Sequence, residues 1–414
     1  MSTKRVVITG MGAMSPLGPD VASTMDALYA GHSGVGKVER FDAAAYATRI
    51  AAEVRDFDPG RYMDRKDAKR ADRYAQFAIA ASKEAVEGAR LHGSDVDPNR
   101  IAVLIGSGIG GMETFETQHQ ALLEKGPSRV SPFFVPMMIS DMASGLVSMQ
   151  YGFKGPNYCA VSACASAANA IATSYLLITG GLADAVVTGG AEACVTPMTM
   201  AGFCSLKAMS ERNDDPGTAS RPFDLGRDGF VLGEGAGILV LEDLDVARRR
   251  GAKIWGELVG IGMTGDAYHM TAPSPDGEGA ARAMQSALDT AGVAPSAVDY
   301  INAHGTSTPY NDKNETHAIK TVFGPHAYRL KVSSTKSMTG HLLGASGGLE
   351  AAVAIHTLTS GKIPPTINQF DRDPECDLDY VPNRAVAADV KFALSNSFGF
   401  GGHNASLLFK RYSE

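Results

Sequence analysis

Short apolar runs and longer amphipathic segments alternate along the 414-residue chain. An unbroken apolar run such as residues 101–106 predicts a strand buried on both faces. Within residues 73–90, Phe77, Ala81 and Ala85 recur at helical spacing and predict one buried helix face. Strands are predicted over residues 6–10, 101–106 and 185–189, a Gly-rich turn over 10–12, and helices near 21–30, over 73–90 and after residue 164. Such alternation indicates an α/β fold.

The second half of the chain repeats this plan. Strands are predicted over residues 253–262, 298–303 and 330–334, and helices over 279–291 and from about 344. Residues 230–233 and 237–241 resemble a hairpin that closes a sheet, and residues 233–241 resemble residues 399–409 in their Gly-rich start and apolar end. We therefore expect duplicated α/β halves with mixed sheets, residues 1–252 and 253–414, and an active site where the halves meet.

Composition narrows the class of protein. The formal net charge of −7 argues against a nucleic-acid binder that works through bulk charge. Five cysteines in a long chain do not form a disulfide framework. The first residues run directly into a strand, and no apolar run reaches transmembrane length, so the expectation is a cytoplasmic protein without a membrane partner.

A glycine motif at residues 106–111 has the form of a dinucleotide fingerprint, G-x-G-x-x-G after a strand. That site also requires an acidic residue at the end of a following strand. Here a loop rich in Pro and Ser follows instead, over residues 126–132. We therefore expect these glycines to allow tight packing of the loop and expect no nicotinamide or flavin.

Cys164 carries the first sign of chemistry. It lies in a run of small residues, 160–168, that opens an apolar helix. A thiol in the first turn of a helix faces unpaired N–H groups and the positive end of the dipole, which favour the nucleophilic thiolate. The alternative is a small buried side chain, as most free cysteines are.

Two histidines decide between these alternatives. His304 follows the predicted strand 298–303, and His341 ends the segment 333–341 before a Gly/Ala-rich helix. Both lie where strands or turns end, which is where α/β proteins place reactive groups. No His or Cys spacing supports a zinc site.

With these residues, the chain resembles the β-ketoacyl-acyl-carrier-protein synthases of thiolase fold, particularly the elongating enzymes of bacterial type II fatty acid synthesis. The resemblance covers the whole chain and depends on the Cys164 turn and on residues 302–308, 333–341 and 396–402. Initiating synthases resemble it but carry Cys-His-Asn. Thiolases need a second cysteine near the C-terminus, and Cys376 lies in an acidic loop instead. The resemblance implies a layered α-β-α-β-α arrangement.

The resemblance also implies a mechanism. Cys164 attacks an acyl thioester, and the backbone N–H groups of Cys164 and Phe400 stabilise the oxyanion. His304 and His341 stabilise the enolate that forms when malonyl-carrier protein loses CO₂, and the enolate attacks the acyl group. Lys336 organises the site, paired with Glu350. No resident cofactor is implied, because phosphopantetheine arrives on the carrier protein.

Further residues carry implied roles. Phe400 is expected to gate the acyl pocket. The implied pocket and pantetheine residues are Ile109, Phe203, Thr271, Thr306, Thr308, Leu343 and Phe398. The implied docking patch for acidic acyl carrier protein is Lys66, Lys69, Arg70, Arg129 and Lys207, although Asp64, Asp67 and Asp72 dilute it. An implied structural site for a monovalent cation comprises Asn302, Glu315, Glu350, Ser395 and Asn396. The family is homodimeric.

Two residues depart from the family pattern, and two other classes of protein resemble this chain. His403 stands where the family has threonine, and Ala165 stands where it has threonine or serine. A polyketide ketosynthase shares the fold and the three reactive residues, so the motifs do not separate it. A non-catalytic chain-length partner typically lacks the cysteine, and Cys164 therefore argues against that class.

Overall fold

A ten-stranded mixed sheet runs through the computed structural model, which describes residues 4–413. The strands lie in the order β10 (Lys331–Ser333), β9 (Tyr300–Asn302), β13 (Phe392–Gly399), β14 (His403–Lys410), β8 (Gly256–Gly265), β1 (Val6–Met14), β7 (Gly235–Asp243), β6 (Ala185–Glu192), β4 (Ile101–Gly106) and β5 (Asn157–Tyr158). The junction of β1 with β8 is short, from Val6 opposite Leu258 to Ile8 opposite Gly256.

The sheet has the same pattern on both sides of that junction. From β1 outward, β7 and then β6 join antiparallel, and β4 and β5 join parallel. From β8 outward, β14 and then β13 join antiparallel, and β9 and β10 join parallel. This repetition is the duplicated plan expected from the sequence. The division between residues 252 and 253 stays a prediction.

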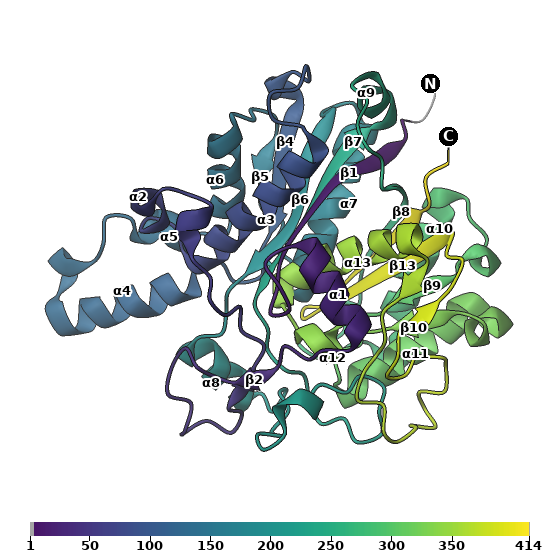
Figure 1. The fold of residues 1–414 in the computed structure, drawn as a ribbon. Helices are drawn as coiled ribbons and strands as arrows, with labels where there is room; N and C mark the ends of the chain where they lie inside the picture. Colours follow the sequence, from purple (N-terminus) through teal and green to yellow (C-terminus); the bar gives the residue numbers. More distant parts are fainter. Residues whose placement is uncertain (1–3, 414) are drawn as a thin grey trace.

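Helices pack in three layers around the two halves of the sheet (Figure 1). In the central core, α7 (Ser166–Thr179) and α13 (Ser346–Ser360) pack between the two sheet halves. Outer helices α3 (Arg73–Ala89) and α6 (Met142–Tyr151) cover the N-terminal half, and α10 (Glu278–Ala291) and α11 (Pro309–Phe323) cover the C-terminal half. The expected α-β-α-β-α layering is confirmed.

The remaining elements connect or flank these layers. They are α1 (Val21–Ala30), α2 (Arg65–Ala68), α4 (Met112–Lys125), α5 (Phe134–Met138), α8 (Pro197–Ser205), α9 (Leu244–Arg249), α12 (Lys336–Thr339) and two strand pairs, β2 (Gly36–Lys37) with β3 (Ile50–Ala51) and β11 (Lys362–Ile363) with β12 (Val386–Ala387). Within residues 4–413, none of the helices combines the length and apolar character that crossing a bilayer requires.

The predicted turn at Gly10–Gly12 is wrong, because β1 continues through it to Met14. A Cβ atom on Gly12 would lie 1.9 Å from the carbonyl oxygen of Ala81 in α3. The second half repeats this contact, with a Gly262 Cβ 1.9 Å from the Ala283 oxygen in α10. These glycines therefore let an outer helix pack directly on a strand rather than turn the chain.

Two further expectations concern short segments. The predicted hairpin is wrong: β7 pairs with β1 and β6, while Phe230 forms only an isolated bridge to Met209. The tight packing expected of the glycine motif is confirmed, since a Cβ on Gly106 would lie 2.6 Å from the Ser166 backbone. The helix α4 follows the motif, and no strand with an acidic end comes next.

Candidate active site

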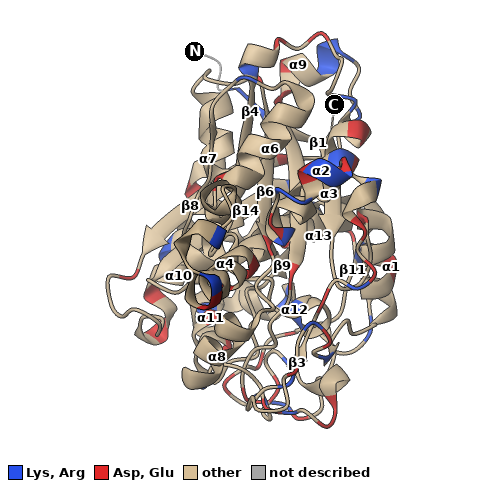
Figure 2. Ribbon diagram, turned by 90° about the vertical axis from the view of Figure 1, so that its left-hand side faces the viewer, with Lys and Arg blue, Asp and Glu red and all other residues tan. Residues whose placement is uncertain are grey.

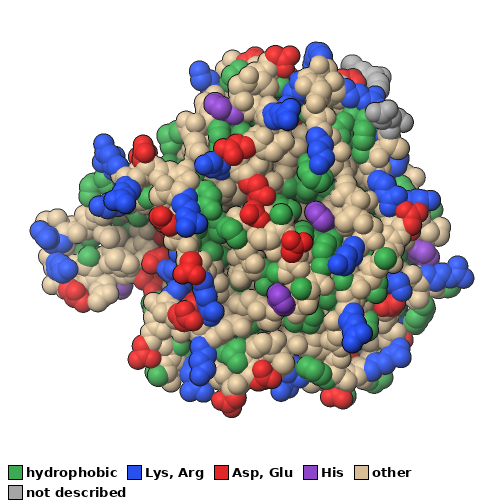
Figure 3. Space-filling model, viewed as in Figure 1, with side chains coloured by type: hydrophobic (Ala, Val, Ile, Leu, Met, Phe, Trp, Pro, Cys, Tyr) green, Lys and Arg blue, Asp and Glu red, His purple; other side chains and the backbone are tan. Residues whose placement is uncertain are grey.

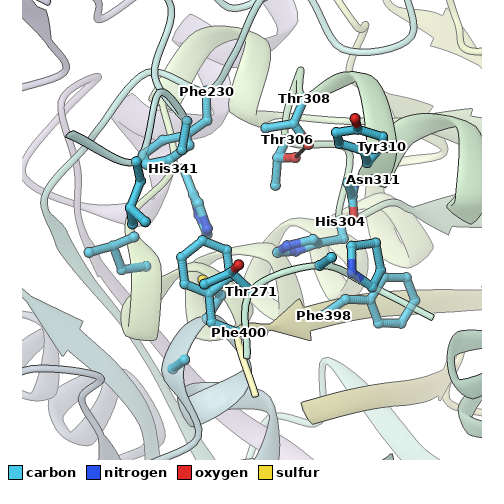
Figure 4. Close-up of a pocket in the computed structure, with 18 of the residues that line it drawn as sticks. Phe230, Thr271, His304, Thr306, Thr308, Tyr310, Asn311, His341, Phe398 and Phe400 are labelled. Atoms are coloured by element: carbon cyan, nitrogen blue, oxygen red, sulfur yellow. Dashed lines mark hydrogen bonds between the residues drawn. The ribbon is translucent and has the colours of Figure 1, made fainter. Parts of the chain in front are cut away.

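A cavity of about 540 Å³ gathers residues from both halves of the chain (Figure 4). Its walls include Cys164 from the N-terminal half and both His304 and His341 from the C-terminal half. The expected pocket residues also line it: Ile109, Phe203, Thr271, Thr306, Thr308, Leu343, Phe398 and Phe400. Residues that the motifs did not indicate, among them Phe230, Tyr310 and Asn311, complete the lining.

Cys164 lies in a single 3₁₀ turn, Ala163–Ala165, immediately before α7. The turn begins in the left-handed region, with a φ of 50° at Ala163, a strained conformation for a residue with a Cβ. Ser166 secures the turn: its hydroxyl donates to the Ala163 carbonyl oxygen at 2.7 Å and accepts from the Ser162 N–H at 2.9 Å. The sharp turn places the thiol at the cavity wall, with 9% of the residue exposed.

The expectation of a stabilised thiolate is wrong for the free protein. Burial raises the pKa of the Cys164 thiol to about 12 and outweighs the opposing groups. Those opposing groups are the Lys336 charge and the backbone N–H groups of Phe400 and of Cys164 itself, all of which lower the pKa. The two N–H groups that face the sulfur are the pair expected to hold an oxyanion.

The two histidine rings lie nearly perpendicular in the cavity, with centroids 5.3 Å apart at 85°. His304 follows β9 and His341 follows α12. Burial and the nearby positive charge of Lys336 lower the pKa of both rings well below the usual value. Both imidazoles are therefore neutral at pH 7, and each carries one N–H and one acceptor nitrogen.

A serine that the motifs did not indicate orients His341. The Ser346 hydroxyl lies 3.0 Å from Nδ1 of His341, at the start of α13. When that hydroxyl donates to Nδ1, the ring proton remains on Nε2. The signal was present in the repeat, because Leu343–Ser346 has the same turn as Ala163–Ser166, including a φ of 48° at Leu343.

Lys336 lies behind the cavity wall, 1% exposed, and pairs with Glu350 of α13. The expected pairing is confirmed. The ammonium group does not line the cavity. It acts on the site through its charge, which favours the thiolate at Cys164 and neutral rings at His304 and His341.

The residues expected at a cation site are all buried. Both side-chain atoms of Asn302 and one carboxylate oxygen of Glu350 lack a hydrogen-bond partner among the described residues. Glu315 instead accepts from the N–H groups of His304 and Gly305, at 2.9 and 2.8 Å, and from Asn396 at 3.2 Å. Partnerless buried oxygens fit a monovalent cation, and these are the atoms that would hold it.

The expected carrier-docking residues are exposed but spread out. Lys66, Lys69 and Arg70 lie on or just after α2, where Asp64 and Asp67 are also exposed (Figure 2). Asp72 is buried and caps α3. Arg129 lies beyond α4, and Lys207 is the one member that reaches the cavity rim.

The two departures lie on either side of the site. Ala165 is fully buried beside Cys164. His403 is exposed, opposite Gly399 in the β13–β14 hairpin, and its ring lies against Gly401. Neither replaces a group that the cavity chemistry uses.

Known proteins match this chain over its whole length. The family model for the β-ketoacyl synthase N-terminal domain matches residues 3–247, and that for the C-terminal domain matches residues 255–370. The 3-oxoacyl-[acyl-carrier-protein] synthase 2 of Synechocystis sp. is 55% identical over 412 residues, which cover 100% of this chain and 99% of the relative.

Solved structures agree. A β-ketoacyl synthase from Burkholderia phymatum superposes with a TM-score of 0.92 at 38% identity, covering 99% of this chain and all of that one. A type II PKS acyl-carrier protein complexed with its ketosynthase gives a TM-score of 0.91 at 34% identity, with both chains fully covered. With two family models and full-length relatives in agreement, the chain belongs to the β-ketoacyl synthase family.

Proposed function

We propose that this chain is a condensing enzyme that joins an acyl group to malonyl-carrier protein through an acyl-Cys164 intermediate, giving a β-ketoacyl-carrier protein in fatty acid elongation. The observation that carries this proposal is the meeting of Cys164 with two neutral histidines in one cavity. Identity to synthases of fatty acid type, at 55–56%, exceeds the 34% found for the polyketide ketosynthase complex.

In the first half-reaction, the Cys164 sulfur attacks the acyl thioester carbonyl. Because burial keeps the thiol protonated, its proton must leave as substrate binds; neutral His304 accepts it and passes it to the departing pantetheine sulfur. The N–H groups of Cys164 and Phe400 then hold the oxyanion, and each such donor contributes about 3 kcal/mol. Pantetheine thiol leaves with the carrier.

In the second half-reaction, malonyl-carrier loses CO₂ and leaves an enolate at its thioester. An Nε2–H on His341, supported by Ser346, and an N–H on His304 stabilise the enolate oxygen. The enolate carbon attacks the Cys164 thioester, the new carbon–carbon bond forms as the carbon–sulfur bond breaks, and Cys164 leaves as a thiolate that takes up a proton to restore the thiol.

Intact-protein mass spectrometry with acyl-carrier proteins of graded chain length tests this proposal. We expect an acyl mass gain on the wild-type chain that malonyl-carrier removes with release of a β-ketoacyl product. Cys164→Ala should show no adduct and no condensation. It should still decarboxylate malonyl-carrier, because both histidines remain, which controls for folding. Condensation by Cys164→Ala would contradict the mechanism.

We also propose that no resident cofactor takes part and that phosphopantetheine arrives on the carrier protein. Exposed basic residues from Lys66 to Arg70, with Arg129 and Lys207, support docking of an acidic carrier, whose affinity should fall as salt rises.

Asn302 and Glu350 support a structural cation, so potassium should raise the melting temperature relative to choline. The sparse, odd cysteine set supports a cytoplasmic location, which fractionation would test.

We further propose a homodimer through the N-terminal half. The strand β5 ends the sheet there, and both its residues are exposed. Large apolar side chains are exposed on α6, on α5 and just after β5, with Met149 at 68%, Val135 at 57% and Val161 at 59% exposure. The helix α4 projects beside this edge and buries only Thr114 (Figures 1 and 3). A second copy would cover the unpaired strand edge and the apolar side chains together.

A further inference from the structure

A buried carboxylate beneath the cavity floor is left unused by the mechanism. Glu192 is the last residue of β6 and is 0% exposed. Besides the Cys194 thiol at 3.5 Å, its oxygens accept from four donors: the Ser107 hydroxyl at 2.8 Å, and the N–H groups of Gly108 at 2.7 Å, Ile109 at 3.2 Å and Gly344 at 3.0 Å. Burial raises the pKa of the Glu192 carboxyl overall, and the hydrogen bonds from Ser107, Gly108, Ile109 and Gly344 oppose that shift by favouring the ionised form. No cation pairs with this carboxylate among the described residues.

These donors come from two segments that border the nucleophile. Gly108 and Ile109 belong to the loop after β4, and Gly344 belongs to the turn before α13. Gly108, Ile109 and Leu343 line the cavity with Cys164. The two segments also touch each other, since a Cβ on Gly344 would lie 2.3 Å from the Gly108 nitrogen. Glu192 therefore joins two walls of the acyl site.

The repeat explains why a carboxylate occurs here. Gly344 occupies the same place in its turn as Cys164 does in the first turn. The N–H of Cys164 faces its own sulfur and is available to an oxyanion. The N–H of Gly344 is instead occupied by a Glu192 oxygen that also accepts from Gly108. The second turn thus holds a carboxylate where, in the proposed mechanism, the first receives an oxyanion.

The charge of Glu192 also reaches the nucleophile. Burial is the main cause of the raised pKa of Cys164, and the charge of Glu192 adds to it, opposed by Lys336. The other titratable groups at the sulfur are His304 and His341, which share the cavity and are neutral at pH 7. The Cys194 thiol also contacts the Glu192 carboxylate, at 3.5 Å.

We propose that Glu192 is a positioning residue of the condensation reaction: it fixes the Gly108–Ile109 loop against the Leu343–Gly344 turn, and its negative charge adds to the burial that keeps Cys164 in the thiol form until substrate binds. The catalytic part of this inference rests on the proposed function. The prediction about the reactivity of the thiol does not rest on the proposed function, because alkylation needs no carrier protein.

Glu192→Gln tests both parts. An amide nitrogen placed toward Ser107, whose hydroxyl can turn to accept, sacrifices only the two longest contacts, to Ile109 and to the Cys194 thiol, so we expect the variant to fold. Loss of the charge should raise the rate of Cys164 alkylation by iodoacetamide at pH 8 about tenfold, measured by peptide mass. The kcat of condensation should fall about tenfold, with the KM for acyl-carrier unchanged.

Two further variants separate charge from position. Glu192→Asp keeps the charge but is too short to hold both segments, so alkylation should stay at the wild-type rate while kcat falls. The control is Glu84→Gln. The Glu84 carboxylate accepts from the backbone N–H groups of Ala13 and Val21, and Glu84 lies outside the cavity lining. This variant should leave both alkylation and kcat unchanged.

Wild-type alkylation and wild-type kcat in Glu192→Gln would overturn the proposal. If that variant does not fold, Ser107→Ala removes one donor to the carboxylate and its link to the Gly110 N–H. A kcat below wild type in folded Ser107→Ala would support the positioning role, and a wild-type kcat would overturn it. If Glu192→Gln raises the rate of Cys164 alkylation while neither the wild-type chain nor any variant catalyses condensation, the proposed function fails and the inference about the charge of Glu192 stands.

Discussion

At the scale of single residues, the site depends on which groups stay neutral. Burial raises the pKa of Cys164, while burial and Lys336 together lower the pKa of His304 and His341. The free cavity therefore holds a thiol and two imidazoles rather than a thiolate–imidazolium pair. Neutral rings are suited to donate to an enolate without giving up a proton, provided that the hydrogen lies on the nitrogen that faces the cavity.

Ser346→Ala should remove the group that sets this tautomer. We expect decarboxylation of malonyl-carrier and the kcat of condensation to fall about tenfold, as loss of one buried hydrogen bond implies. The amount of acyl-enzyme should not change, because Cys164 and its two N–H donors remain. Stopped-flow and mass measurements would check this.

Ser82→Ala is the matched control for that change. Ser82 is also a buried serine, on α3, and its hydroxyl has no partner among the described residues. Its removal should leave both half-reactions at the wild-type rate. An equal loss in both variants would show that Ser346 contributes only general packing.

At the scale of elements, direct contact of helix and strand backbones sets the spacing of the layers. Gly10 and Gly12 in β1, and Gly260 and Gly262 in β8, meet carbonyl oxygens of α3 and α10 at distances that no side chain could occupy. The same contact in both halves keeps each outer helix close to the sheet. The position of each strand end, and so of the loops around the cavity, follows from that spacing.

Gly12→Ala should therefore lower the free energy of unfolding by about 3 kcal/mol, because the Ala81 backbone cannot move away without displacing α3. Gly88→Ala, also near this interface, meets nothing within 4 Å and should stabilise α3 by about 0.5 kcal/mol. Denaturant unfolding of the two variants would measure the difference. Equal stabilities would contradict the packing argument.

At the scale of the whole molecule, the apolar edge around β5 is the feature that a single chain leaves uncovered. Val161→Asp should weaken the proposed dimer by burying a charge in its interface, and light scattering should show a shift toward the mass of one chain. Leu182→Asp changes an equally exposed residue, at 60%, outside the group around β5 and should keep the dimer mass. A wild-type chain that is monomeric at micromolar concentration would refute the dimer.

How far the sequence predicted this molecule differs between its parts. Period and apolar runs predicted the α/β class and the repeat, because strands buried on both faces carry an unmistakable pattern. The turn at Gly10–Gly12 was mispredicted, because glycine is as much a sign of close backbone packing as of a turn, and only the partner helix distinguishes them. The hairpin predicted from residues 230–233 and 237–241 was wrong, because β7 pairs with β1 and β6, which are distant in the sequence.

The site shows the same division. Cys164, His304 and His341 were predicted from motifs and resemblance, and the structure brings them to one cavity. The protonation of Cys164 was mispredicted, since the helix terminus is visible in sequence while burial is not. Glu192 was missed because its contact with Gly108 spans 84 positions, which no local pattern records, and Ser346 was missed because the repeated turn that contains it was not recognised in the sequence.

The junction of β1 with β8 has a consequence for synthesis of the chain. The strand β1 leaves the ribosome first, but its partners β7 and β8 are synthesised only after more than half of the chain. Until then Val6–Met14, apolar and unpaired, is an exposed edge that other nascent chains could engage. We therefore expect chaperone dependence to be greatest before residue 265 emerges.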